Sequence, residues 1–396
     1  MHGVILRRLS HNVTIFERSP SSLLQTQGAG IVAGGETQAF FSKHDRTHTP
    51  IAVVSGLRHY LNHEGKEIDR QDREQKMTSW DLLYNVLRAN FDGGGDKAYV
   101  RGQVIGRSEG EGEARYEVDR IVTGVQEGED GKLEVEYHTH ADKANVQTAT
   151  ADLVIAADGA GSTIRDQFRK VERQYAGYVA WRGTVPEAEV SGDVADAFVE
   201  KFTFYHAHLK DAKGTQILSY VIPGPRGSLQ KGERLVNWVW YCNYAADSAE
   251  WTDLMTDVHG KVNKTTLHAG KMRPLIWESQ QGYAHAVLPP QFAELVDKTK
   301  EPFVQAITDS LLEGDSNCFS NRKIICVGDA VAGFRPHTAA STTQAARQAL
   351  MLDDVLRGSM SWEEFEKETM EYGREVQKSG IEMGDRSQFG KHPLAS

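Results

Sequence analysis

The first twenty residues show an apolar helical stripe, a polar break and a second apolar run. Val4, Ile5 and Leu9 recur at the spacing of one helix face, with charged residues opposite them. The run 13–16 (VTIF) is rich in β-branched residues and ends on the acidic Glu17. A helix, a short turn and a buried strand that ends on an acid are the second half of a βαβ nucleotide-binding unit.

Alternating apolar and polar positions dominate the next hundred residues. Residues 116–118, 121–123 and 133–137 alternate between acidic, glycine-rich turns, which predicts a small antiparallel meander. The meander leads into 151–157 (ADLVIAA), a continuous apolar run typical of a strand that is buried on both faces of a parallel sheet.

From about residue 172 the pattern changes, because aromatic residues become frequent and strict alternation returns at 234–244 (RLVNWVWYCNY). This predicts a mostly antiparallel sheet, with Trp238 and Trp240 in its core. Residues 251–312 read as largely helical, most clearly at 291–312.

A second buried strand is predicted at 322–329, followed by an amphipathic helix at about 338–357. This pattern predicts that the chain leaves one domain, builds another and returns. We predict an α/β fold in which residues 1–170 and 315–396 form a discontinuous nucleotide-binding domain. Residues 171–314 form an inserted antiparallel-sheet domain with helices, to which we assign the substrate.

Composition narrows the possible functions. The 396 residues are 39% hydrophobic and 25% charged, with a net charge of −10, so a nucleic-acid partner is not indicated. The three cysteines have no metal-ligand spacing, so no metal site is predicted, and their usage fits a reducing, cytoplasmic location. No apolar run is long enough for a membrane span. The oligomeric state cannot be read from the sequence.

Residues 152–168 (DLVIAADGAGSTIRDQF) carry the first chemical signal. A buried strand ends on Asp158 and Gly159, and a helix opens at Ser162 or Thr163. Strand carboxyl ends beside helix N-termini are where α/β sheets bind ligands, and glycine lets the backbone approach them closely. The alternative is a plain strand–turn–helix corner with a helix cap.

Residues 324–356 repeat this arrangement. The strand ends on Gly328 and Asp329, a loop carries Arg335, Pro336 and His337, and small residues at 338–341 open the helix. Backbone N–H groups at such a helix start can face an anion or a polarised carbonyl. A loop with a capped helix is again the alternative.

Together these segments resemble the class A flavoprotein aromatic monooxygenases, in particular their 2,6-dihydroxypyridine 3-monooxygenase branch. The resemblance covers nearly the whole chain. The motifs that carry it are TIFERS (14–19), GAGI (28–31), TSWDLLYNVLRANF (78–91), ADGAGSTIR (157–165), YAGYVAWRGTV (175–185), VNWVWY (236–241), GDAVAGFRPHTAAS (328–341) and GDRSQFG (384–390).

The resemblance implies a Rossmann-like domain that binds FAD, with NAD(P)H as a transient electron donor. Glu17 would accept hydrogen bonds from the adenosine ribose, and Asp329 would bind sugar hydroxyls of FAD. Asp158 and Gly159 would lie in a motif that serves both FAD and the nicotinamide donor. Around the flavin, the resemblance implies ring contacts for Pro336, Ala339 and Ala340 on one side and for Gly28, Ala29 and Gly30 on the other, and a place near the phosphates for Arg88.

The implied reaction hydroxylates a phenol-like or hydroxypyridine-like ring with NAD(P)H and O2, through a flavin C4a-hydroperoxide. His337 is the catalytic candidate, because a histidine could hydrogen-bond or deprotonate a ring hydroxyl. The ring itself and the choice between NADH and NADPH are left open.

The opening segment leads to a different expectation about whether this chain binds FAD. The family's first strand and glycine loop would stand before Met1, which suggests a shortened gene model or, alternatively, a truncated, non-catalytic remnant that no longer binds FAD. A further alternative is another Rossmann enzyme, such as a dehydrogenase or a methyltransferase. The two later Gly–Asp corners and the aromatic sheet domain do not fit that alternative.

Overall fold

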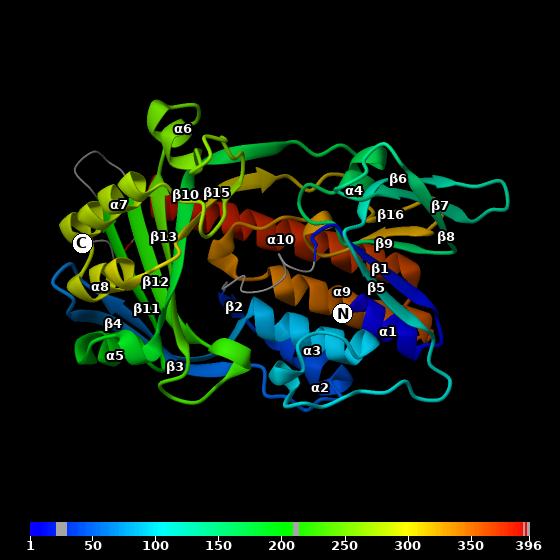
Figure 1. Ribbon diagram of the computed structural model, residues 1–396, viewed down its shortest axis with the longest axis horizontal. Coiled ribbons are helices and arrows are strands. Elements are labelled where there is room, and N and C mark those ends of the chain that lie inside the picture. The colour runs from blue at the N-terminus through cyan, green and yellow to red at the C-terminus, as the bar shows by residue number, and fades with distance from the viewer. Residues whose placement is uncertain (21–29, 209–213, 391–392, 394–396) are drawn as a thin grey trace.

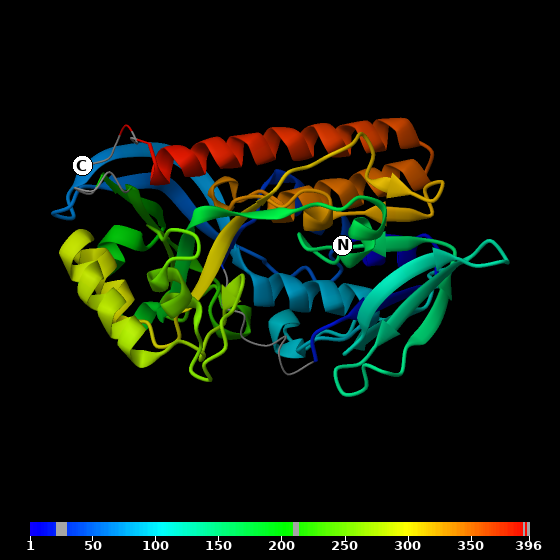
Figure 2. The same ribbon diagram turned by 90° about the horizontal axis from the view of Figure 1, so that it is seen from above.

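The computed structural model describes residues 1–20, 30–208, 214–390 and 393. The molecule is elongated, with one large sheet toward one end and several small sheets toward the other (Figure 1). Two long helices lie lengthwise in the molecule, and the longer of them reaches from the small sheets to the large sheet, as the view from above shows (Figure 2). They are α9 (Ser341–Leu356) and α10 (Trp362–Gln388).

The N-terminal segment folds as predicted, as α1 (His2–Arg8) followed by β1 (Val13–Glu17). Val4 and Ile5 are buried in a core shared with α3 (Trp80–Asp92) and α9. β1 pairs in parallel with β5 (Ala114–Val118). The predicted meander is therefore wrong at 116–118, because that segment is the partner of β1.

The antiparallel meander lies one strand further along the chain. It consists of β6 (Ile121–Glu127), β7 (Leu133–His138) and β8 (Gln147–Ala151). The predicted strand at 151–157 is interrupted, since β8 ends at Ala151 and β9 covers only Val154–Ala156. β9 pairs in parallel with β17 (Ile324–Cys326), which also pairs with β16 (Cys318–Phe319).

The large sheet has nine strands among the described residues and is mostly antiparallel. It extends beyond the predicted range 171–314, because three strands from residues 30–79 join it at one edge. In spatial order the strands are β14 (Thr266–Leu267), β15 (Phe303–Ser310), β10 (Arg173–Pro186), β13 (Leu235–Asn243), β12 (Gly214–Ile222), β11 (Lys201–His208), β3 (Val53–Leu61), β4 (Glu67–Ser79) and β2 (Gly30–Val32).

The helical prediction for 291–312 is wrong in its second half. α8 (Pro290–Lys298) is a helix, but Phe303–Ser310 forms β15 and pairs with β10. Pro302 removes a backbone donor and disfavours helix in the residue before it, so no helix continues through this point and the following segment is extended.

The two faces of the large sheet differ in what covers them. On the outer face Trp181, Trp238 and Trp240 are fully buried against helices, as predicted for the last two. Those helices are α5 (Gly192–Phe198), α6 (Ala249–Met255), α7 (Pro274–Val287) and α8, of which α5, α7 and α8 flank the sheet at the end of the molecule (Figure 1). The inner face, toward α9 and α10, carries the aromatic cluster described below.

The remaining helices are the predicted amphipathic helix and several short ones. The amphipathic helix predicted at 338–357 is confirmed as α9. The others are α2 (Gly35–His44) and α4 (Thr163–Phe168), with the 3-10 turns η2 (Lys97–Val100), η3 (Glu187–Glu189), η4 (Pro225–Gly227), η5 (Gly328–Ala330) and η6 (Pro336–Thr338). Within the described ranges, no helix is long and apolar enough to cross a membrane, and no cluster of metal-ligating side chains is found.

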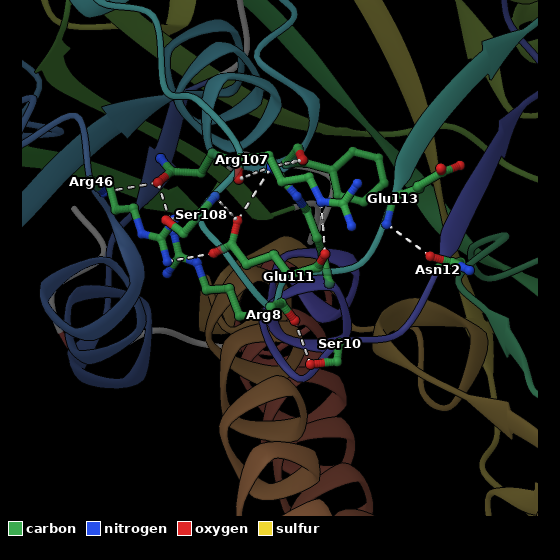
Figure 3. A network of polar contacts seen from close by, with 12 residues as sticks. Arg8, Ser10, Asn12, Arg46, Arg107, Ser108, Glu111 and Glu113 are labelled. Carbon is green, nitrogen blue, oxygen red and sulfur yellow. Dashed lines mark hydrogen bonds and ion pairs between the residues drawn. The ribbon is translucent and has the colours of Figure 1, made fainter.

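A buried ionic network ties α1 to the loop before β5 (Figure 3). Glu111 lies 3.3 Å from the Arg7 guanidinium and 2.5 Å from that of Arg46. Burial alone would raise the pKa of Glu111, but the hydrogen bond from Arg46 and the charges of both arginines hold it below its usual value. Arg7 also donates to the Phe91 carbonyl at the end of α3, so one side chain joins three segments.

Replacing Glu111 with glutamine is expected to lower the free energy of unfolding by about 3 kcal/mol, because it leaves the buried Arg7 cation without its counter-charge. Chemical denaturation at neutral pH measures this. The matched control is Glu113→Gln, whose ion pair with Arg115 is exposed and worth less than about 1 kcal/mol. Equal losses in the two variants would contradict the assignment.

Candidate functional site

The two Gly–Asp corners predicted from the sequence lie side by side. β9 and β17 are parallel neighbours with Ala156 opposite Cys326, so Asp158 and Asp329 follow the same edge of one sheet. Arg165 joins the two corners, because its guanidinium donates to the carbonyl of Ala160 at 3.0 Å and to that of Ala330 at 3.2 Å. The structure thus brings together two segments about 170 residues apart in sequence.

Asp158 acts within its own corner as a helix cap. Its carboxylate accepts hydrogen bonds from the Ser162 hydroxyl at 2.5 Å and from the Ile164 N–H at 3.2 Å. Ser162 is the N-cap of α4, as predicted, and Gly159 adopts a φ of +84° that favours glycine. The helix-cap interpretation of this corner is therefore confirmed, whereas a cofactor role for Asp158 and Gly159 stays a prediction.

Asp329 is different, because its carboxylate is buried and incompletely bonded. Oδ1 has no hydrogen-bond partner among the described residues. Burial raises the pKa of Asp329, against the opposing influence of the Ser341 hydroxyl and the Arg173 cation. A buried carboxylate oxygen without a donor is costly, so this position fits a ligand that brings hydroxyl groups to it.

The loop between the second corner and α9 is held by one arginine. Arg335 is buried and forms ion pairs with Asp309 at 2.5 Å and with Asp385 at 2.6 Å. These contacts tie the loop to β15 and to the end of α10. Pro336 then opens η6, Ala339 adopts a left-handed φ of +52°, and Ala340 is the N-cap of α9.

Left-handed backbone is uncommon for residues other than glycine, so this turn is strained at Ala339. The surrounding loop contacts hold it in place. Strain of this kind is typical of positions that present backbone groups to a ligand.

His337 points from this loop onto the inner face of the large sheet. Its ring stacks on Tyr241 with centroids 4.3 Å apart, and its Nε2 lies 3.0 Å from the Tyr178 hydroxyl. Burial and the nearby Arg335 cation lower the pKa of His337 to about 3, so the imidazole is neutral at pH 7.

The hydrogen-bond direction follows from the neighbours of Tyr178. Burial raises the pKa of Tyr178, so its hydroxyl keeps its proton at neutral pH. Arg335 lies beside that oxygen and can only donate, so the Tyr178 O–H donates to Nε2 of His337. This assignment leaves the imidazole proton on Nδ1, where it is available as a donor.

The end of α10 closes this corner of the site. Gly384 packs so closely that a methyl group there would overlap the Tyr178 hydroxyl and lie 2.8 Å from the Arg335 guanidinium. Further along, Ser387 donates to Gln216 at 2.6 Å, and Asn243 donates to the Gln388 carbonyl at 2.8 Å. The GDRSQFG segment therefore fixes the sheet, the loop and the helix against one another.

The inner face of the sheet is aromatic with a few polar positions. Register places Tyr178, Ala180, Arg182 and Thr184 of β10 on this face. The neighbouring strands add rows of side chains that continue across the sheet. They are Asn237, Val239 and Tyr241 of β13, Gln216, Leu218 and Tyr220 of β12, and Phe202, Phe204 and His206 of β11.

Gly30 approaches this face from the edge strand β2. Its N–H donates to Asn237 Oδ1 at 3.2 Å, and an added methyl group would lie 2.7 Å from the Tyr220 ring. Only glycine therefore fits here without displacing Tyr220. Gly28 and Ala29 lie outside the described residues, so their predicted ring contacts stay untested.

Glu17 and Arg88 lie with the β1–β5 pair. Glu17 ends β1 and accepts a hydrogen bond from the Ser19 N–H at 2.7 Å. Arg88 makes two hydrogen bonds to Asp92 and one to the Tyr84 hydroxyl, and it covers the Tyr116 ring. Because these local contacts already use Arg88, its predicted role near a phosphate has no support from its hydrogen bonds.

Sequence reasoning missed the tyrosines of the inner face and the C-terminal closure. A usable signal existed: alternation at 174–186 and 234–244 places Tyr178 and Arg182 on one face of their strand, and Asn237 and Tyr241 on one face of theirs. Which of the two faces turns toward the loop at 335–340 could not be inferred without the register.

Comparisons with known proteins bear on this site. A family model described as FAD binding domain-like matches residues 175–309. The chain is 29% identical over 370 residues to 2,6-dihydroxypyridine 3-monooxygenase of Paenarthrobacter nicotinovorans, an alignment that covers 91% of this chain and 82% of that protein.

Two solved structures extend the comparison. The structure of 2,6-dihydroxypyridine-3-hydroxylase from Arthrobacter nicotinovorans matches with a TM-score of 0.80 and 25% identity, over 100% of this chain and 92% of that chain. A salicylate hydroxylase substrate complex matches with a TM-score of 0.63 and 14% identity, over 99% and 87% of the two chains, and shows the fold alone. The predicted fold class is confirmed.

Proposed function

We infer that this chain, which resembles the class A flavoprotein aromatic monooxygenases along its whole length, is an FAD-dependent monooxygenase that hydroxylates an aromatic or heteroaromatic ring. The observation that carries this is the match to 2,6-dihydroxypyridine 3-monooxygenase in sequence over 91% of the chain, together with the corresponding structural match at a TM-score of 0.80. NAD(P)H and O2 are the expected co-substrates of this class.

Asp329 is the observation which indicates that the described residues can hold FAD. Its buried Oδ1 has no donor among the described residues, and hydroxyl groups of the cofactor would supply one. We propose that Glu17, Asp158, Gly159 and Asp329 hold the nucleotide and ribityl parts. The ring side would be formed by Gly30, Pro336, Ala339 and Ala340, and the proposal retains Gly28, Ala29 and Arg88 from the resemblance.

Bound FAD would accept a hydride from NAD(P)H and deliver one oxygen atom of O2 to the ring. The protein's own part is to bind and orient the aromatic substrate and to exclude water. The inner face offers Tyr220 and Tyr241 as buried walls for a planar ring. His337 stands above Tyr241, and among the described residues its Nδ1–H has no acceptor, so it can donate to a ring oxygen.

Of the two roles considered for His337, the geometry favours hydrogen bonding over proton abstraction. Its Nε2 already accepts from Tyr178, and its lowered pKa makes it a weak base near pH 7. We propose that His337 is a catalytic residue in the sense that it contacts and orients the substrate oxygen.

The substrate class we propose is a hydroxypyridine-like heterocycle. The relative with 29% identity is named 2,6-dihydroxypyridine 3-monooxygenase, after a substrate of this class. A phenol is the second candidate. The alternative of a remnant that no longer binds FAD has no support from the comparisons. A cytoplasmic location is part of the proposal and rests on cysteines that form no disulfide among the described residues.

The test is ring-dependent oxidation of the nicotinamide donor. The purified protein is incubated with FAD, and NADH or NADPH consumption is followed with and without 2,6-dihydroxypyridine, salicylate or another phenol. The proposal expects stimulation by the dihydroxypyridine together with a hydroxylated product. Stimulation by a phenol alone would move the substrate class to the second candidate, and no bound flavin would overturn the proposal.

Replacing His337 with alanine is expected to lower kcat/KM for the ring by about a hundredfold, the usual effect of removing one aligned donor. His337→Asn keeps an N–H near the position of Nδ1 and should retain more activity. Steady-state kinetics with the compound that stimulates oxidation of the nicotinamide donor measures both effects. Retained FAD absorbance is the check on folding.

The lowered pKa of His337 predicts how stability and activity depend on pH. The folded-state pKa of about 3 lies below the usual 6.5, so the stability contributed by neutral His337 is complete above about pH 6.5 and is lost as pH falls toward 3. Activity should therefore show no ionisation of His337 between about pH 5 and 9. An acid limb near pH 6.5 that vanishes in His337→Asn would contradict the assignment.

A further inference from the structure

The large sheet has a free edge along most of β4. In the spatial order of the strands only β2 follows β4, and β2 pairs with residues 77–79 alone. Residues 67–75 pair with β3 on one side and have no strand partner on the other among the described residues. Their outward backbone N–H and C=O groups can therefore pair with a further strand.

The side chains of this edge carry charges of both signs. Residues 67–75 read EIDRQDREQ, and most of them are exposed. Charged edge strands usually prevent association, because a partner strand meets like charges. Acids and bases are mixed here, so the order of the charges and the register of the partner decide between repulsion and attraction.

Antiparallel pairing of this edge with a second copy of itself has one register that is free of like-charge contacts. When Gln71 lies opposite its own copy, Asp69 lies opposite Arg73 of the second copy. In the same register Arg70 lies opposite Asp72 of the second copy. Two-fold symmetry repeats both contacts, so all of these opposite residues attract.

The neighbouring registers all bring like charges together. A shift of one residue places Asp69 opposite Asp72 in one direction and Arg70 opposite Arg73 in the other. A shift of two residues places Arg70 or Asp72 opposite its own copy. Like charges directly opposite each other destabilise a strand pair, so the sequence of this edge selects the register centred on Gln71.

The attracting residues also lie on matching faces of the strand. Arg70 and Asp72 are two positions apart and share one face, whereas Gln71 lies on the other face, opposite Arg58 of β3. Burial and the Arg73 cation both lower the pKa of Arg58, which places Arg73 on the same face as Gln71. Directly opposite residues of an antiparallel pair share a face, so each acid reaches its base without crossing the sheet.

Within one molecule these charges are incompletely compensated. Arg70 and Asp72 approach each other only to 3.7 Å, and their side chains are 57% and 91% exposed. Asp69 accepts one hydrogen bond, from the Gln71 amide at 3.3 Å. Arg73 forms no ion pair among the described residues and lies near a second cation, Arg58. A carboxylate opposite Arg73 would offset the repulsion between these two cations.

We propose that this edge binds the same edge of a second copy of the chain, as a symmetric antiparallel strand pair centred on Gln71. The inference does not depend on the proposed function. The β3–β4 hairpin lies at the large-sheet end of the molecule, whereas the two Gly–Asp corners belong to the small sheets at the other end (Figure 1). Dimerisation therefore leaves those corners uncovered.

The predicted contact is short and largely electrostatic. The register with β3 shifts between the partners of Ser55 and Leu57, so an irregularity in β4 interrupts the ladder just beyond Asp72. A small interface of this kind gives a dimer that depends on protein concentration. Its exposed ion pairs are screened by salt, so the dimer should dissociate as ionic strength rises.

Sedimentation velocity of the FAD-incubated full chain tests the proposal over a range of protein concentrations. At about 50 mM salt the mass should rise toward twice that of the monomer as concentration increases. At about 500 mM salt the dissociation constant should be at least about tenfold higher. The net charge of −10 would produce the opposite trend if general repulsion governed association, because salt would then favour the dimer.

A charge swap distinguishes this register from other modes of association. Asp72→Arg places two cations opposite each other at two symmetric positions and should raise the dissociation constant by at least about tenfold. The double variant Arg70→Asp with Asp72→Arg restores opposite charges in reversed order and should dimerise as wild type does. Asp315→Arg is the matched control, because it makes the same change at an exposed ion pair on another surface.

Loss of the dimer in Asp72→Arg with recovery in the double variant supports the proposal. A wild-type chain that stays monomeric at every concentration in low salt overturns it. A dimer that responds equally to Asp72→Arg and Asp315→Arg uses another surface and also overturns it, as does a double variant no better than Asp72→Arg. An unchanged melting temperature shows that each variant is folded.

Discussion

Replacing Asp329 with alanine is expected to weaken FAD binding by at least about tenfold, so that the desalted protein loses most of its flavin absorbance. On the function proposed above, the Asp329 carboxylate accepts charge-assisted hydrogen bonds from cofactor hydroxyls, each worth about 1.5–3 kcal/mol, and the substitution removes them. The measurement is the ratio of flavin to protein absorbance after incubation with FAD and gel filtration, followed by titration of FAD fluorescence.

Removing the charge of Asp329 without changing its size should have the opposite effect on the flavin-free protein. Burial raises the pKa of Asp329, so the ionised form opposes folding at neutral pH when no ligand satisfies it. Asp329→Asn should therefore unfold at an equal or higher denaturant concentration than wild type without FAD, and at a lower one with FAD. Asp315→Asn, at an exposed ion pair, is the control. Unchanged FAD retention in Asp329→Ala would remove this residue from the site.

Replacing Arg335 with methionine is expected to lower the free energy of unfolding by about 3–5 kcal/mol. The substitution leaves Asp309, a partly buried carboxylate, without its partner and removes the tie between the loop, β15 and α10. The control is Arg322→Met, whose two ion pairs are more exposed and worth about 1 kcal/mol or less.

Catalysis should fall further than stability alone explains, because Arg335 precedes the turn that carries His337. The double variant Arg335→Met with Asp309→Asn should recover part of the lost stability, since the unpaired carboxylate is removed, but not the activity. Urea denaturation and steady-state kinetics measure the two effects. A loss no larger than that of Arg322→Met would show that the loop is held by other contacts.

Local patterning was enough to predict the elements that depend on short-range periodicity. The helix–strand opening ending at Glu17, the cap at Ser162 and the amphipathic helix α9 follow directly from residue spacing. The two Gly–Asp corners were recognised for the same reason, and their meeting through Arg165 follows from the parallel pairing of β9 with β17.

Features that depend on strand pairing were not predictable in this way. Residues 116–118 alternate like a hairpin strand, yet they pair in parallel with β1, and Phe303–Ser310 carries a helical pattern but completes the edge of the large sheet. The contact between His337 and Tyr178 joins residues 159 positions apart and depends on the register of β10 and on the end of α10. No local periodicity encodes such a contact.

The position of Arg182 illustrates the same limit. Its place in the motif YAGYVAWRGTV was visible in the sequence, but that it faces Tyr220, Tyr241 and Asn237 follows only from the pairing of β10, β13 and β12. Sequence patterning therefore located the two Gly–Asp corners, whereas tertiary pairing defines the aromatic inner face of the large sheet.

The origin of the oxygen atom in the product tests the central claim most directly. The protein is incubated with FAD, the nicotinamide donor and 2,6-dihydroxypyridine under ¹⁸O2, and the product is analysed by mass spectrometry. A monooxygenase incorporates one labelled oxygen atom into the ring and consumes one nicotinamide donor for each product. Label that enters from H2¹⁸O instead, or oxidation of the donor with no hydroxylated ring from any of the compounds tested, would contradict the account.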